Sequence, residues 1–372
     1  MNVILGIGLI FALIFATAGA LKIFPAVARA VLGEDPPERI TSMDGLRGLL
    51  ALSVFLHHIV ISHGFFAGYP WRPPPHRFDN LVGRAAVALF FMISGYLFWG
   101  RVVRNRGRLN WFRFFKGRVL RLAPLFYASD LLLFAIVAIE TRFTLRVPVA
   151  QLARQVGIWL SFGFCAPVDI NGLKGTFTIL STQWTLEYEW IFYLSLPFLA
   201  LLYRFTRRDW LIYPVIFALS LWAGGRWRLC AFFATGFIAV HILNLRPTAV
   251  ARTLWMWAGT AALAVLCGLY RDEVGIVQIL LIFLIFIAAI QAAGPWAVMR
   301  WRPVRYLGHI SYSVYLLHNP VIHVFAKWIF GATRYGSLNL PELYGAAFLT
   351  GLGVIALSTF TFVYVEKPFF YR

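Results

Sequence analysis

The residues best suited to take part in a chemical reaction lie on one apolar stretch of the chain, residues 46–63. Arg47 stands near its start and a histidine, His58, follows eleven positions later. Eleven residues of an α-helix turn through about 1100°, about 20° more than three full turns, so both side chains share one face, about 16 Å apart along the axis. A neutral imidazole can take a proton from a hydroxyl group or attack a carbonyl carbon. His58 is the candidate catalytic residue, and its role as general base or as nucleophile stays open.

The neighbours of these two residues favour different roles. Asp44 precedes Arg47 by three positions, so the two can pair if the helix extends that far. We include Asp44 among the candidates that line a substrate cavity. His57 is rotated by about 100° from His58, and we expect it to be a packing residue.

A second candidate site is basic. Arg118 and Arg121 are three residues apart and fall on one helical face. Paired guanidinium groups suit bidentate binding of phosphate. They end the segment 101–121, which holds eight Lys and Arg and no acidic residue. Control of membrane topology accounts for the other six charges, whereas the last two stand directly before an apolar run.

Two further stretches carry polar groups on apolar segments. Glu187 and Glu189 follow Trp184 at the start of one such segment. They are about 200° apart on a helix and cannot form an acid–base pair. A later segment places three residues on one face at spacings of three: Tyr312, Tyr315 and His318. Aromatic packing is the alternative to a role for these three in a substrate cavity.

The elements that must position these residues are membrane helices. Of the 372 residues, 60% are hydrophobic and 13% are charged, against about 25% charged in soluble domains. Mean hydropathy is +0.74. A soluble chain of this composition could not cover its surface with polar groups. The sequence therefore predicts an all-α polytopic membrane protein, embedded in a lipid bilayer.

Apolar runs long enough to cross a bilayer recur along the chain. We predict about eleven transmembrane helices, at residues 3–24, 46–63, 81–100, 122–139, 184–203, 211–224, 229–244, 254–270, 275–294, 309–330 and 345–364. Basic residues collect in cytoplasmic loops, so segment 101–121 is assigned to the cytoplasm. The N-terminus is then outside and the C-terminus inside. The net charge of +19 reflects this bias, and we expect no nucleic-acid partner.

The N-terminal helix stands apart from the rest. No basic residue precedes its apolar run, whereas Lys22 and Arg29 follow it; this order favours a retained helix over a cleaved signal peptide. We predict two parts: residues 1–38, an extra transmembrane helix with a cytoplasmic linker, and residues 39–372, a ten-helix body. The three cysteines are scattered and odd in number, so they form neither a complete disulfide framework nor a zinc site.

Together these motifs resemble the integral membrane acyltransferase 3 family. The matching stretches occur in family order and cover nearly the whole ten-helix body. They are Asp44-Gly-Leu-Arg47-Gly with His58, Phe90-Phe-Met-Ile-Ser94-Gly-Tyr96, Arg118-Val-Leu-Arg121 with Pro124, Trp184 through Glu189 to Tyr193, Ser311 through Tyr312 and Tyr315 to His318, and Glu366-Lys-Pro368. Thr185 replaces the family's usual serine, and Glu187 is an added acid.

The resemblance assigns roles by position. His58 matches the essential intramembrane histidine and Arg47 the arginine that accompanies it. Glu189 falls on the family's glutamate, and the catalytic set is therefore His58, Arg47 and Glu189. Arg118 and Arg121 match the paired arginines, which with Arg47 would bind acyl-CoA. Further residues of the matching stretches are expected to line a substrate cavity: Asp44, Ser94, Trp184, Tyr312, Tyr315 and His318.

The resemblance also implies the reaction. A bacterial inner-membrane O-acyltransferase would take an acyl group from a cytoplasmic acyl-CoA and pass it to an extracytoplasmic carbohydrate or lipid-linked glycan, with no metal. We favour acetyl, from acetyl-CoA, over succinyl or another short acyl group. The identity of the acceptor and the oligomeric state stay open. The alternative is a membrane transporter or lipid flippase, although no second copy of the Asp44–His58 pattern suggests related halves. A sensor that has lost activity is a third possibility, which the intact arginines and His58 disfavour.

Overall fold

The computed structural model describes residues 3–33, 39–73, 77–206, 212–244, 247–269 and 275–370. Throughout these ranges the regular structure is helical, apart from one isolated bridge between Ile170 and Leu173. This confirms the all-α prediction. Part of the predicted linker, residues 34–38, lies outside the described residues, and the division at residue 38 stays a prediction.

Helices long and apolar enough to cross a membrane confirm the polytopic membrane class. In the described ranges six qualify: α1 (Val3–Ile23), α3 (Thr41–Phe66), α4 (Arg77–Arg104), α5 (Trp111–Glu140), α11 (Ala249–Leu269) and α16 (Leu340–Thr361). A pair bent by 68°, α12 (Ile276–Gln291) and the short helix Gly294–Arg300, is either a seventh, broken span or a re-entrant loop.

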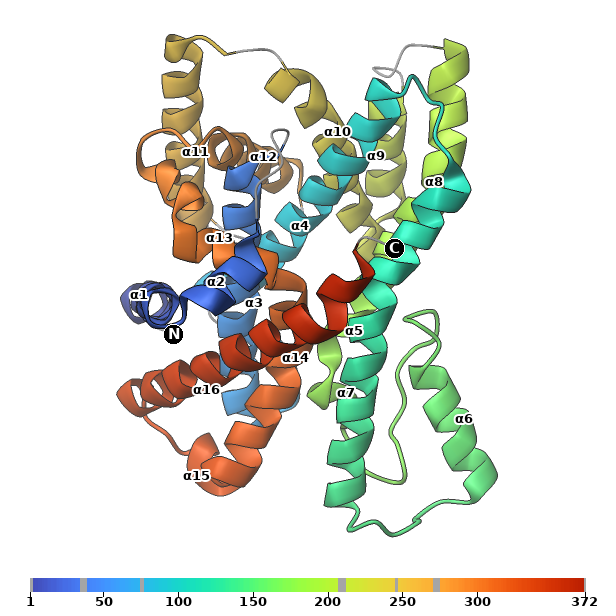
Figure 1. Ribbon diagram of the computed structural model, residues 1–372, viewed down its shortest axis with the longest axis vertical. Helices are drawn as coiled ribbons and strands as arrows, with labels where there is room; N and C mark the ends of the chain where they lie inside the picture. Colours follow the sequence, from blue (N-terminus) through green and yellow to red (C-terminus); the bar gives the residue numbers. More distant parts are fainter. Residues whose placement is uncertain are drawn as a thin grey trace. The chain divides into compact units, whose positions relative to one another are not determined.

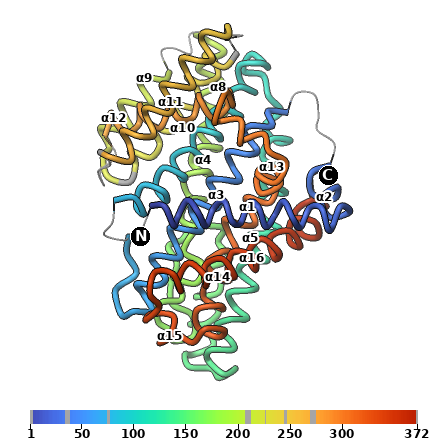
Figure 2. Tube along the Cα trace, turned by 90° about the vertical axis from the view of Figure 1, so that its left-hand side faces the viewer, coloured from blue at the N-terminus to red at the C-terminus, as the bar shows by residue number. Residues whose placement is uncertain are grey.

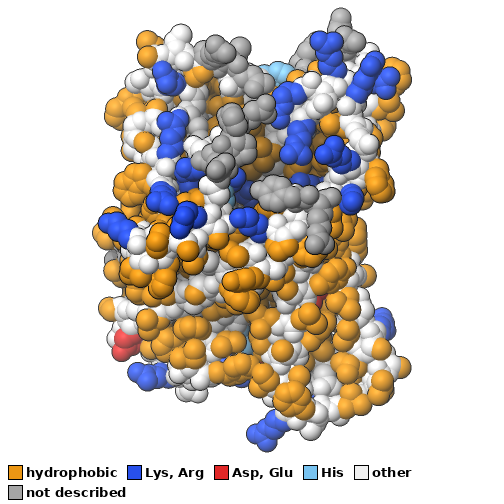
Figure 3. All heavy atoms as spheres, viewed as in Figure 1, with side chains coloured by type: hydrophobic (Ala, Val, Ile, Leu, Met, Phe, Trp, Pro, Cys, Tyr) orange, Lys and Arg blue, Asp and Glu red, His pale blue; other side chains and the backbone are white. Residues whose placement is uncertain are grey.

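The other predicted spans also correspond to helices, but shorter or more polar ones. These are α8 (Trp184–Thr206), α9 (Ile212–Ala223), α10 (Ala231–Asn244) and α14 (Ser311–Val324). The total of eleven spans therefore stays a prediction. The helices expose many large apolar side chains, and Lys and Arg gather in clusters on the face shown in Figure 3.

The basic segment 101–121 is mostly helical rather than the loop that the sequence suggested. Helix α4 continues to Arg104 and α5 begins at Trp111, so only residues 105–110 connect them. Arginine and lysine are good helix formers, and a helix can continue beyond the apolar core of a membrane. Arg118 and Arg121 are thus on α5 itself.

Contacts divide the chain into two compact units. Unit 1 comprises Met1–His57, Pro73–Trp111 and Ile191–His309, and unit 2 comprises His58–Arg72, Phe112–Trp190 and Ile310–Arg372. Within unit 1, α4 packs on α10, and α11 on α12 (Figure 1). Helix α1 lies against α13 (Arg302–His309) and leads into α2 (Pro25–Leu32), as Figure 2 shows.

Glycines of the matched motifs account for the tight packing in unit 1. A Cβ on Gly45 would collide with the backbone of Met299, and one on Gly48 would lie 2.5 Å from the carbonyl oxygen of Val304. Reciprocally, Gly308 on α13 meets the backbone of Asp44. Small residues at such contacts let helix backbones approach closely. The glycines of the stretch Asp44–Gly48 therefore hold the start of α3 against α13 and against the short helix Gly294–Arg300.

Unit 2 forms its core around α5. Seven buried side chains make one cluster: Leu133, Ile136, Val137, Trp159, Ile170, Ile179 and Leu180. They come from α5, α6 (Val149–Trp159), α7 (Thr176–Ile179), the segment between the last two, and the residue directly after α7. Helix α14 packs along α16 (Figure 1), and Leu316 and Leu317 of α14 contact Leu125 of α5.

Candidate active site

His58 opens onto a cavity within unit 2. The cavity measures about 310 Å³. Its walls are mainly apolar and carry four aromatic side chains, Trp71, Trp159, Phe177 and Trp184; the polar residues Ser181 and Gln183 also line it. The ring of Trp71 lies 6.2 Å from that of His58, between centroids. A histidine at an aromatic-walled cavity of this size can act on a small organic substrate.

A second histidine determines which nitrogen of His58 carries a hydrogen. His318 Nδ1 is 2.9 Å from the carbonyl oxygen of Val314, which can only accept, so Nδ1 holds the hydrogen of the neutral ring. His318 Nε2 is then an acceptor, 3.2 Å from His58 Nδ1. His58 Nδ1 must donate to it, and the lone pair of a neutral His58 is on Nε2. The hydrogen-bond network thus assigns the tautomer.

The polar wall of the cavity is held by buried partners. Gln183 Nε2 donates to Asp130 Oδ1 at 2.8 Å, and Asn319 Nδ2 donates to Ser181 Oγ at 2.6 Å. Asp130 is fully buried and Asn319 is 2% exposed. These hydrogen bonds tie the segment before α8 to α5 and to α14, respectively. Helical spacing did not indicate Asp130, Asn319 or their partners, because each pair joins residues more than fifty positions apart.

The predicted tyrosines on α14 form hydrogen bonds within unit 2 and are not among the residues lining the His58 cavity. Tyr312 donates its hydroxyl to the carbonyl oxygen of Leu122 at 2.9 Å. The hydroxyl of Tyr315 is 3.0 Å from Thr185 Oγ1, within hydrogen-bond distance. Trp184 lines the His58 cavity, whereas Glu187 and Glu189 are half-buried on α8 and are not among its lining residues.

Arg121 forms a buried ion pair that the motif match did not anticipate. Its Nη1 is 2.7 Å from Glu366 Oε2, and the Glu366 side chain is 0% exposed. Ser313 donates to the other carboxylate oxygen. The guanidinium also lies 4.2 Å from the ring centroid of Phe370. The structure thus gives the matched Glu366 a role, which is to hold Arg121 within unit 2.

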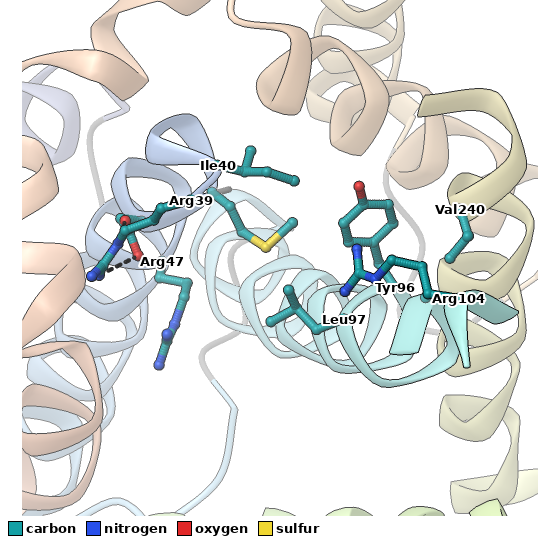
Figure 4. Close-up of a pocket in the computed structure, with 10 residues that line it drawn as sticks. Arg39, Ile40, Arg47, Tyr96, Leu97, Arg104 and Val240 are labelled. Atoms are coloured by element: carbon teal, nitrogen blue, oxygen red, sulfur yellow. Dashed lines mark hydrogen bonds and ion pairs between the residues drawn. The ribbon is translucent and has the colours of Figure 1, made fainter. Parts of the chain in front are cut away.

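Unit 1 contains a smaller, basic pocket of about 190 Å³, shown in Figure 4. Three arginines and one aspartate are among its lining residues: Arg39, Arg47, Arg104 and Asp44. Both oxygens of Asp44 accept from Arg39, at 2.6 and 3.0 Å. Arg39 was not predicted, because it lies outside the helical repeat that links Asp44 with Arg47. The net positive lining suits an anionic group.

The two remaining predictions concern α3 and α4. His57 Nδ1 donates to the carbonyl oxygen of Asp79 at 2.7 Å, and a Cβ on Gly83 would meet the His57 ring at 2.5 Å. This close packing agrees with the structural role expected of His57. Ser94 is half-buried on α4 and is not among the residues lining the basic pocket of unit 1.

Comparison with known families identifies the chain. A family model described as an acyltransferase domain, acyltransferase 3, matches residues 40–365. The chain belongs to this family. It is therefore an acyltransferase, and a multi-pass membrane protein. No solved structure matches it significantly.

Three similar proteins illustrate the family. The exopolysaccharide production protein ExoZ of Rhizobium meliloti is 26% identical over 78% of this chain and 90% of its own length. The putative membrane-bound transacylase BcsY of Komagataeibacter xylinus is 27% identical over 92% of this chain and 86% of its own length. The peptidoglycan O-acetyltransferase OatA of Listeria monocytogenes is 22% identical over 88% of this chain and 55% of its own length.

Proposed function

We propose that this acyltransferase transfers an acetyl group from acetyl-CoA to a hydroxyl group of an extracytoplasmic carbohydrate, with His58 at the reacting centre. The observation that carries the proposal is the hydrogen bond from His58 Nδ1 to His318, at the aromatic-walled cavity. This bond leaves the lone pair on His58 Nε2, where either catalytic role requires it.

As a general base, Nε2 takes the proton of the acceptor hydroxyl while that oxygen attacks the thioester carbonyl carbon. The carbon–sulfur bond then breaks, CoA leaves as the thiolate and receives the proton, and an ester remains. As a nucleophile, Nε2 instead attacks the thioester itself and passes the acetyl group on. In both routes Nδ1 keeps its hydrogen, and His318 holds the ring in place.

The arginines are proposed to bind the donor. Arg47 lines the basic pocket of unit 1, and Arg118 and Arg121 stand one turn apart on α5. Guanidinium groups bind phosphate in bidentate fashion, and CoA carries several phosphates. Glu366 orients Arg121 for this role through one of its nitrogens. Glu189 remains a proposed catalytic residue, and its carboxylate is near enough to the Tyr315 hydroxyl to act on it electrostatically.

The proposed acceptor follows from the cavity walls and from the relatives. Aromatic rings have apolar faces that can pack on the C–H face of a sugar ring, and Trp71, Trp159 and Trp184 supply such faces. Two similar proteins are named for exopolysaccharide production and for peptidoglycan O-acetylation. We place the protein in a bacterial inner membrane, with its N-terminus outside and its C-terminus in the cytoplasm, where acetyl-CoA is available.

The test is transfer across a bilayer. Proteoliposomes would be supplied with [14C]acetyl-CoA on one side and with glucose or N-acetylglucosamine oligomers on the other. We expect label on the glycan that neutral hydroxylamine releases, as it does from an ester, and none with empty liposomes. Absence of transfer from both acetyl-CoA and succinyl-CoA, combined with uptake of a labelled glycan, would favour the transporter alternative.

A further inference from the structure

Ser181 and His58 line the same cavity and are both attached to one turn of α14. His318 holds His58 at 3.2 Å, and the next residue, Asn319, holds Ser181 at 2.6 Å. His318 is fully buried and Asn319 is 2% exposed. Adjacent residues of a helix are about 3.8 Å apart at Cα. The two buried neighbours His318 and Asn319 therefore position both groups at the cavity wall.

The bond from Asn319 decides what the Ser181 hydroxyl can do. Asn319 Nδ2 is the donor, so Ser181 Oγ accepts and keeps its own hydrogen. Asn319 Oδ1 is buried without a hydrogen-bond partner. If the amide were reversed, the NH2 group would take its place, and two buried N–H groups without partners would cost more free energy than one such oxygen. A hydroxyl can accept and donate at once. Within the described residues, no hydrogen bond uses the hydrogen of Ser181.

We infer that Ser181 is a catalytic residue that donates a hydrogen bond to the oxyanion formed from the acyl thioester, and that Asn319 is its positioning residue. The inference rests on the proposed function. Attack on the thioester carbonyl moves an electron pair onto its oxygen, whichever nucleophile attacks. The Ser181 hydroxyl stabilises that negative charge without giving up its proton. Collapse of the intermediate returns the electron pair and expels the CoA thiolate.

Preorganised donors of this kind act mainly on the transition state. The substitution Ser181→Ala removes the donor and should lower kcat by roughly 10²–10³-fold, with the KM for acetyl-CoA nearly unchanged. Ser181→Thr retains the hydroxyl and should recover most of the rate. A residue with a merely structural role would change KM, kcat and stability together.

Asn319→Asp supplies a second, sharper variant. The substitution preserves the shape of the side chain, but a carboxylate only accepts hydrogen bonds. The Ser181 hydroxyl must then donate to that carboxylate, and its hydrogen is no longer available to the substrate. We expect a fall in kcat similar to that of Ser181→Ala. The double variant should be no slower than either single variant, because both changes remove the same interaction.

The experiment measures transfer or hydrolysis of [14C]acetyl-CoA by purified protein, with binding of unlabelled CoA and elution as a single species as folding controls. A full rate for Ser181→Ala, while His58→Gln is inactive, would overturn this inference and leave the proposed function intact. Multiplied losses in the double variant would overturn it as well. A wild-type protein without turnover of any acyl-CoA would overturn both.

Discussion

The buried pair of Arg121 and Glu366 provides the sharpest test of the packing in unit 2. Replacing Arg121 with methionine leaves a carboxylate that is 0% exposed without its cation. Breaking a buried pair in this way costs about 3–5 kcal/mol. Because the Arg121 side chain is 19% exposed, water can reach the site, and we expect a loss near the lower value, about 3 kcal/mol.

The assay is an unfolding titration with SDS in mixed micelles, which measures the free energy of unfolding. Lys116→Met, at an exposed position of the same helix, removes the same charge and should change stability by no more than about 0.5 kcal/mol. The double variant Arg121→Met with Glu366→Gln should regain part of the loss, because no buried charge remains. Equal stability of Arg121→Met and Lys116→Met would refute the reasoning.

Three other substitutions test separate parts of the account. Arg118→Ala should weaken CoA binding in calorimetry while leaving the fold intact, and unchanged affinity would remove its proposed role. His318→Phe fills the same space but cannot accept from His58, so kcat should fall roughly 10- to 100-fold with little change in KM; an unaltered rate would contradict the tautomer assignment. Gly308→Ala, which forces a methyl group onto the backbone of Asp44, should cost about 1–3 kcal/mol of stability, and an unchanged SDS midpoint would show that this contact is not tight.

Local periodicity explains what could be predicted from the sequence. The 100° rotation between neighbouring helical residues distinguished His57 from His58, and the structure gives His57 a backbone partner, Asp79. Apolar run lengths located the ends of the described long helices to within about five residues, except for α5, which begins at Trp111 rather than at residue 122. Such features depend only on residues close in sequence, so they can be worked out before the tertiary structure is known.

The polar network around His58 could not be predicted in this way. His318 is 260 positions from His58, and Asn319 is 138 from Ser181. Both contacts depend on where α14 packs, which no helical repeat specifies. Asp44 illustrates the same limit at short range. Helical spacing suggested Arg47 as its partner, but the structure shows both carboxylate oxygens bound by Arg39, from the segment before α3.

The central claim is that His58 carries the chemistry, and one comparison tests it most directly. Purified wild-type, His58→Ala and His57→Ala proteins in detergent would be assayed for loss of [14C]acetyl from CoA. We predict that His58→Ala lowers the rate by roughly 10²–10⁴-fold while the protein still inserts into membranes, and that His57→Ala has a mild effect. Normal turnover by both variants would contradict the mechanism.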